Sequence, residues 1–120
     1  YLDGGVAAPI PIDKALAEGA DRLVVVLTRP RGFVKKPQHM SGVFKAVYRN
    51  YPNMVRAIAR RHEVYNKTLE RLWQLEKDGV AIVAAPPLAL AVDRFGKNRD
   101  ELINAFSIGR VVGQAELKKL

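Results

Sequence analysis

Two uninterrupted apolar runs stand out in the pattern of hydrophobic and polar positions along the chain. The first covers residues 23–28 and the second covers residues 80–85. The first run is rich in valine and shows no alternation of apolar and polar side chains. An unbroken β-branched run predicts a strand that is covered on both faces, as in parallel sheets with helices on either side. The second run predicts a further strand.

Two short helices are expected on either side of a basic loop. Pro11 suits the first position of a helix over residues 11–18, and Gly19 suits its left-handed end. Residues 29–39 combine proline and glycine with four basic residues and should form a surface loop. The pattern turns helical again over residues 41–48.

A long amphipathic helix is predicted after Pro52, and Asp78-Gly79 should stop it. Its apolar face recurs at steps of three and four residues. The members of this face are Val55, Ile58, His62, Tyr65, Leu69, Leu72 and Trp73. A last helix is expected over residues 99–120, because Asn98 and Glu101 have the spacing of a capping box.

The alternation of strands and helices indicates an α/β layered sheet. Together with the end of a strand before Asp3, the two apolar runs give about three strands. Doubly wound sheets usually have five or six. We therefore expect further strands before Tyr1. On this interpretation, residues 1–120 are the C-terminal part of a single larger α/β domain.

Composition removes several classes of protein. No apolar run approaches the roughly 20 residues of a membrane-spanning helix. The chain has no cysteine, which excludes a disulfide framework and a thiol nucleophile and fits a cytoplasmic location. Two histidines are too few for a histidine-rich metal site, so we expect no metal and no cofactor.

Asp3 is the strongest candidate for chemistry. It precedes Gly4 and Gly5 and would lie at the carboxyl end of a strand, where ligands and catalytic groups gather in open α/β sheets. A carboxylate there could act as a general base toward a serine hydroxyl. The same tripeptide is also common in plain turns. These residues alone leave both interpretations open.

Four segments follow one another in a distinctive order near the start of the chain: YLDGGV, PIP, ALAEGA and LVVVLT, at residues 1–6, 9–11, 15–20 and 23–28. This order resembles the catalytic-aspartate region of patatin-like phospholipases. Three later segments resemble bacterial members: TRP, YP and RHEVYN, at residues 28–30, 51–52 and 61–66.

The resemblance implies a three-layer α/β/α domain with a mainly parallel sheet, which hydrolyses acyl esters of lipids with a Ser-Asp dyad. It implies that Asp3 is the dyad aspartate, with Gly4 and Gly5 completing its motif. The family's serine lies in a Gly-x-Ser-x-Gly elbow and its oxyanion hole in a glycine-rich loop, and neither motif occurs in this sequence. We therefore expect this chain alone to be inactive.

Three other side chains invite a catalytic interpretation. Ser107, in AFSIG, has the outline of an elbow, but it falls inside a predicted helix. Ser41 is better explained as a helix cap. His62 lies on the apolar side of its helix, which favours a packed, hydrogen-bonded histidine over a base.

A strongly basic stretch supports a second class of function. Residues 22–62 contain ten Lys and Arg and no acid, and thus carry the whole net charge of +8. In this alternative the chain is a noncatalytic module that binds an anionic membrane or an acidic partner. Arg29, Arg31, Lys35 and Lys36 would contact anionic headgroups in either case. A solvated basic face is the plain alternative, and nucleic acid is not expected because no recognisable binding module is present.

Overall fold

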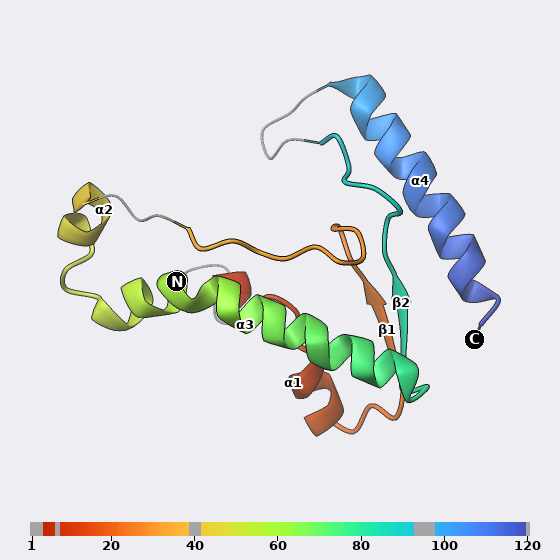
Figure 1. Cartoon of the computed structure of the whole chain (residues 1–120), viewed down its shortest axis with the longest axis horizontal. Helices are drawn as coiled ribbons and strands as arrows, with labels where there is room; N and C mark the ends of the chain where they lie inside the picture. Colours follow the sequence, from red (N-terminus) through yellow and green to blue (C-terminus); the bar gives the residue numbers. More distant parts are fainter. Residues whose placement is uncertain (1–3, 7, 39–41, 93–97, 120) are drawn as a thin grey trace. The chain divides into compact units, whose positions relative to one another are not determined.

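A computed structural model describes residues 4–6, 8–38, 42–92 and 98–119 (Figure 1). The elements in chain order are η1 (Gly4–Val6), α1 (Ile12–Ala17), β1 (Leu23–Val26), α2 (Gly42–Val47), α3 (Pro52–Lys77), β2 (Ala81–Ala84) and α4 (Arg99–Leu117). The chain divides into two compact units. One combines Tyr1–Asp21 with Val34–Leu75, and the other combines Arg22–Phe33 with Glu76–Leu120.

A parallel strand pair forms the centre of the second unit. β1 pairs with β2 in a register that sets Leu23 opposite Ala81 and Val26 opposite Ala84. Backbone hydrogen bonds extend the pairing at both ends, from Leu23 N to Val80 O at 2.9 Å and from Leu27 N to Ala84 O at 2.8 Å. α4 contacts β2. Mixed helices and parallel strands confirm the α/β class.

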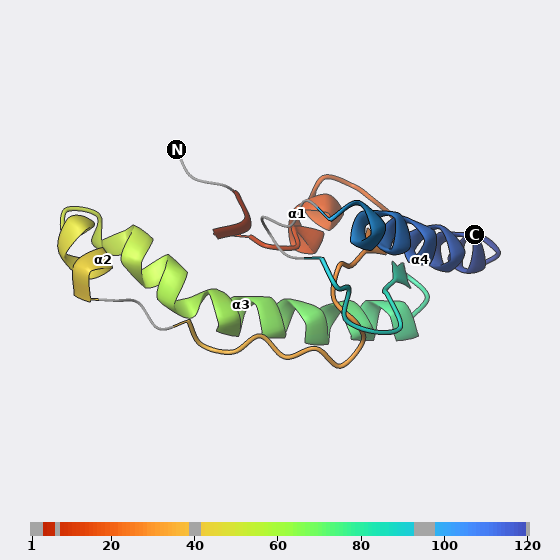
Figure 2. The same ribbon diagram turned by 90° about the horizontal axis from the view of Figure 1, so that it is seen from above.

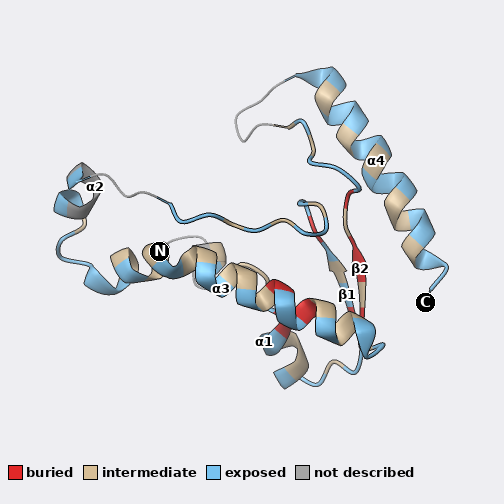
Figure 3. Cartoon of the chain, viewed as in Figure 1, coloured by how far each residue is buried: buried red, intermediate tan, exposed pale blue. Residues whose placement is uncertain are grey.

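The burial of β1 corrects one expectation. Leu23 and Leu27 are buried, but Val24 and Val26 leave 60% and 75% of their surface exposed. In Figure 3, β2 is drawn largely as buried, whereas β1 is not. The prediction that both faces of this strand are covered is therefore wrong for the described residues. Successive side chains of a strand point to opposite faces. On the second face, α4 contacts β2 but leaves Val24 and Val26 exposed. An unbroken valine run cannot reveal how far a covering layer extends.

The first unit has its core along α1 and α3. Ile12, Leu69 and Leu72 are its buried apolar side chains among those described. An ion pair of 2.7 Å between Asp13 and Arg71 joins the two helices. The long amphipathic helix is confirmed, and Figure 2 shows α3 without a break. It ends where predicted, because Gly79 takes a φ of 76° that other residues rarely adopt.

The cap of α4 is confirmed with a modified geometry. The Asn98 side-chain oxygen accepts a hydrogen bond from the backbone N–H of Asp100 at 3.0 Å. Its amide nitrogen donates to the Glu101 carboxylate at 3.3 Å. In a standard capping box the acidic side chain would instead accept from the backbone of the cap residue. Asn98 thus satisfies a free N–H of the helix and also holds the acid near its positive end.

Candidate functional site

Asp3 lies outside the residues that the structure describes, whereas its neighbours Gly4 and Gly5 begin η1. Ala8 N donates to Gly4 O at 2.9 Å and closes this short turn. A Cβ added at Gly4 would meet nothing within 4 Å. The space beside Gly4 is therefore open.

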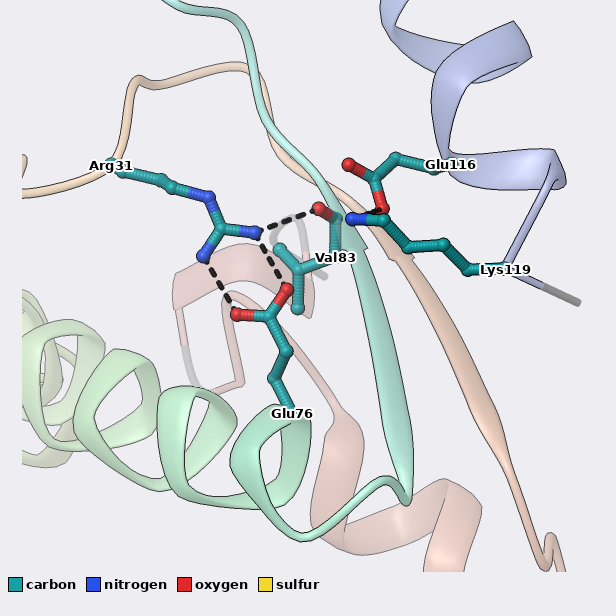
Figure 4. Close-up of polar contacts among 5 residues, drawn as sticks. All are labelled: Arg31, Glu76, Val83, Glu116 and Lys119. Carbon is teal, nitrogen blue, oxygen red and sulfur yellow. Dashed lines mark hydrogen bonds and ion pairs between the residues drawn. The ribbon is translucent and has the colours of Figure 1, made fainter.

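Arg31 is the centre of a polar cluster in the second unit (Figure 4). Its Nη1 and Nη2 donate to the two carboxylate oxygens of Glu76, both at 2.6 Å. Nη2 also donates to the carbonyl oxygen of Val83 at 3.2 Å. This fork connects the loop after β1 to the end of α3 and to β2. A bidentate guanidinium–carboxylate pair has a fixed geometry, so Arg31 orients the loop.

The electrostatics of the pair follow from these contacts. The hydrogen bond from Arg31 lowers the pKa of Glu76 below its usual value. The same hydrogen bond raises the pKa of Arg31, with a smaller contribution from the charge of Glu116. Glu116 itself is paired with Lys119 at 2.6 Å. Arg31, one of the four basic residues predicted to contact headgroups, therefore already has an anionic partner within the chain.

The other three basic candidates have different surroundings. Arg29 lies over the Phe33 ring, 5.2 Å from its centre, and Lys35 lies 5.5 Å from the centre of the Tyr65 ring. Lys36 is exposed. Arg29 and Arg31 belong to the second unit, whereas Lys35 and Lys36 belong to the first. The four residues are thus divided equally between the two units.

A side-chain amide holds the segment that contains Lys35. The backbone N–H of Lys35 donates to Asn66 Oδ1 at 2.9 Å, and Asn66 Nδ2 donates back to the Lys35 carbonyl at 3.1 Å. Asn66 thereby reproduces the paired hydrogen bonds of a neighbouring strand. The extended segment after residue 33 is attached to α3 at this point.

An apolar cavity of about 230 Å³ lies in the second unit, where the carboxyl ends of β1 and β2 face α4. Carboxyl ends of parallel strands are the usual place for ligands in open α/β sheets. The lining is apolar except for Thr28. Its members are Val26, Leu27, Thr28, Ala84, Pro86, Leu90, Ala105, Ile108, Gly109, Val112 and Gly113. A small apolar group fits this chemistry.

Two glycines of α4 open this cavity. A Cβ at Gly109 or Gly113 would meet nothing within 4 Å, and neither glycine has a positive φ. Sequence reasoning missed the cavity. The available signal was the pair of glycines four residues apart, which puts both on one face of a helix.

Two of the three remaining catalytic candidates, Ser107 and His62, lie within helices and bond to the backbone of their own helix. Ser107 lies within α4, and its Oγ donates to the Ile103 carbonyl at 2.9 Å, which confirms the helical interpretation. His62 is half-buried in α3 with Nδ1 3.0 Å from the Ala59 carbonyl, so the packed, hydrogen-bonded histidine is confirmed. Ser41 lies outside the described residues.

The described part of the chain contains no group of three or more His, Asp or Glu side chains arranged to hold a metal ion. None of its helices combines the length and the apolar character needed to cross a bilayer.

Fold and cavity together define an α/β protein with a parallel strand pair and an apolar site at the strand ends. The chain belongs to the family described as a domain of unknown function, DUF6363, whose model matches residues 51–120. No curated protein and no solved structure matches it. The family match covers α3, β2 and α4 and does not reach the Asp-Gly-Gly motif.

Proposed function

We propose that this chain is the C-terminal part of a patatin-like domain that hydrolyses acyl esters of lipids, and that it contributes the aspartate of a Ser-Asp dyad. One observation carries the proposal: the motif Asp3-Gly4-Gly5 precedes a short helix and then a strand of a parallel pair. This is the order in which the sequence resembles the catalytic-aspartate region of that family.

The exposure of β1 supports a larger sheet. Isolated two-stranded sheets are marginally stable, and parallel sheets are normally covered on both faces. Val24 and Val26 expose most of their side chains among the described residues. A mainly parallel sheet between two helical layers would cover these valines, and the three-layer α/β/α arrangement belongs to the proposal for that reason.

The proposed chemistry uses Asp3 as a base and then as an acid. The Asp3 carboxylate takes the proton of a serine hydroxyl supplied by another part of the domain, while the serine oxygen attacks the acyl carbonyl. Backbone N–H groups stabilise the oxyanion. Collapse of the tetrahedral intermediate breaks the ester bond, and the departing alcohol receives the proton from Asp3. Water then cleaves the acyl-serine, giving its proton to Asp3, which returns it to the serine.

The open space beside Gly4 suits this role. A residue with a side chain at this position would occupy this open space. Because Gly4 is exposed, an ester substrate can approach the backbone here. The chain alone supplies no elbow serine, so its isolated form should show no ester hydrolysis.

The test is Asp3→Asn in the full-length protein, assayed with a short-chain aryl ester. Loss of a general base lowers turnover by about 10²- to 10⁴-fold. Asp21→Asn is the matched control, because Asp21 is an exposed aspartate of the same segment and its loss should leave turnover unchanged. Circular dichroism establishes that both variants fold. Unchanged turnover in Asp3→Asn would refute the assignment.

A further inference from the structure

α4 carries exposed apolar side chains that do not line the cavity. Leu102, Ile103, Phe106 and Leu117 are all exposed, and Phe106 leaves 71% of its surface accessible. With 3.6 residues per turn, these four positions fall within about 100° of one another around the helix axis. They form one strip along the helix, in which Leu102, Ile103 and Phe106 are neighbours and Leu117 follows about three turns later.

Two arginines share this strip. Arg99 and Arg110 fall between the apolar positions and are both exposed. Neither belongs to the ion pairs recorded among the described residues. The carboxylates of the helix, on Asp100, Glu101 and Glu116, lie outside the strip by the same periodicity. We call the six residues the apolar-basic face of α4: Arg99, Leu102, Ile103, Phe106, Arg110 and Leu117.

We propose that the apolar-basic face of α4 binds the surface of an anionic lipid bilayer. The helix would lie in the plane of the interface, with its apolar side chains in the boundary between headgroups and acyl chains. The two guanidinium groups would then contact lipid phosphates, which they can bind through paired hydrogen bonds. The positive charge and the apolar surface of this face are thus both complementary to an anionic bilayer.

Charge also argues against a second copy of the chain as the partner. A twofold contact brings the same patch of both copies together. Such a contact would bring together the four guanidinium groups of the two copies. Neither apolar-basic face contains a carboxylate that could pair with them. An anionic bilayer supplies the missing negative charge. This surface is distinct from the basic stretch over residues 22–62, and its binding does not depend on Asp3.

The first experiment locates the bound surface. Phe106→Trp and Val111→Trp are prepared in the 120-residue chain, and the signal of native Trp73 is subtracted as the baseline. Val111 is the matched control because it is also exposed, at 67%, but lies about 140° away around the helix. Brominated lipids in vesicles with about 30 mol% phosphatidylserine should quench the tryptophan at position 106 and leave that at 111 unaffected. Equal quenching, or none, overturns the proposal.

The second experiment measures affinity by vesicle sedimentation. Arg99→Gln with Arg110→Gln should weaken binding about 25-fold, since each arginine near an anionic surface contributes about fivefold. Phe106→Ser should weaken it about tenfold, through the loss of buried apolar surface. Arg22→Gln with Arg49→Gln is the control for total charge and should change binding less than twofold.

An equal loss in the control double variant would assign binding to general charge and overturn the role of α4. A dimer that depends on Phe106, with no vesicle binding, would overturn it in favour of a second copy. Asp3→Asn should leave vesicle binding unchanged. Failure of ester hydrolysis and failure of membrane binding are therefore distinguishable.

Discussion

Removal of the Arg31–Glu76 pair should lower the free energy of unfolding by an amount that can be estimated from the geometry and exposure of the pair. Hydrogen bonds to charged groups contribute about 1.5–3 kcal/mol when they are shielded from water. Here the Arg31 side chain is 51% exposed and that of Glu76 is 26% exposed, so water screens the pair. Two parallel hydrogen bonds of 2.6 Å nevertheless hold the guanidinium and the carboxylate in one relative orientation. We therefore expect a coupling free energy of about 1 kcal/mol, near the upper end for exposed pairs.

A double-mutant cycle measures this coupling. Arg31→Ala, Glu76→Ala and the double variant are unfolded with urea at neutral pH and low salt, and the coupling is the departure from additivity. The exposed pair Lys14–Glu18 is the matched control, because its atoms are 3.7 Å apart and its coupling should stay below about 0.5 kcal/mol. The argument fails if the Arg31–Glu76 coupling is no larger than that of the control.

The same pair predicts a dependence on pH. Arg31 lowers the pKa of Glu76 from its usual 4.5 in the folded chain, and unfolding removes this partner. Since the folded pKa is the lower one, the stabilisation is fully present above the unfolded pKa and is lost as the pH falls through the folded pKa. The stability difference between the native chain and Glu76→Gln should thus be constant at neutral pH and shrink below about pH 4.5. Urea unfolding at several pH values tests this sign.

Three further predictions concern the first unit and the cavity. Asn66→Ala removes two hydrogen bonds to the backbone of Lys35 and should lower the free energy of unfolding by about 1–2 kcal/mol. Hydrogen exchange at the Lys35 amide should accelerate, and an unchanged rate would contradict the contact. Leu72→Ala, at a fully buried position, should cost about 3 kcal/mol in urea unfolding, whereas Val64→Ala on the exposed side of the same helix should cost less than about 1 kcal/mol. Gly109→Leu should fill the cavity without a backbone clash and abolish binding of a small aromatic probe such as benzene, followed by NMR. Retained benzene binding would show that the cavity is not the site.

Local patterns predict the helices of this chain well. α3 has an apolar face at helical spacing and a glycine just beyond its end, and α4 has Asn98 as its cap. These signals lie within a few residues of one another, so they act before any tertiary contact forms. The exposure of Val24 shows the limit of such patterns. A valine-rich strand has the same sequence whether or not a second layer covers it.

The site depends on contacts between distant parts of the sequence. Arg31 and Glu76 are 45 residues apart, and Lys35 and Asn66 are 31 apart. No periodicity links such residues, so neither pair could be predicted from the pattern. Asp3 is a candidate from sequence because its motif is local, while the cavity requires the register of β1 and β2 as well as the position of α4.

The Asn66 contact also has a consequence for how this chain can vary among its relatives. Asn66 and Lys35 fix both ends of a segment that contains α2. We therefore expect a change in the length of this segment to leave the conformation outside it unchanged. Each doubling of a flexible loop adds only about 0.6 kcal/mol to the entropy of closing it. Insertions and deletions should therefore accumulate within residues 36–51, while the asparagine that closes the loop is retained.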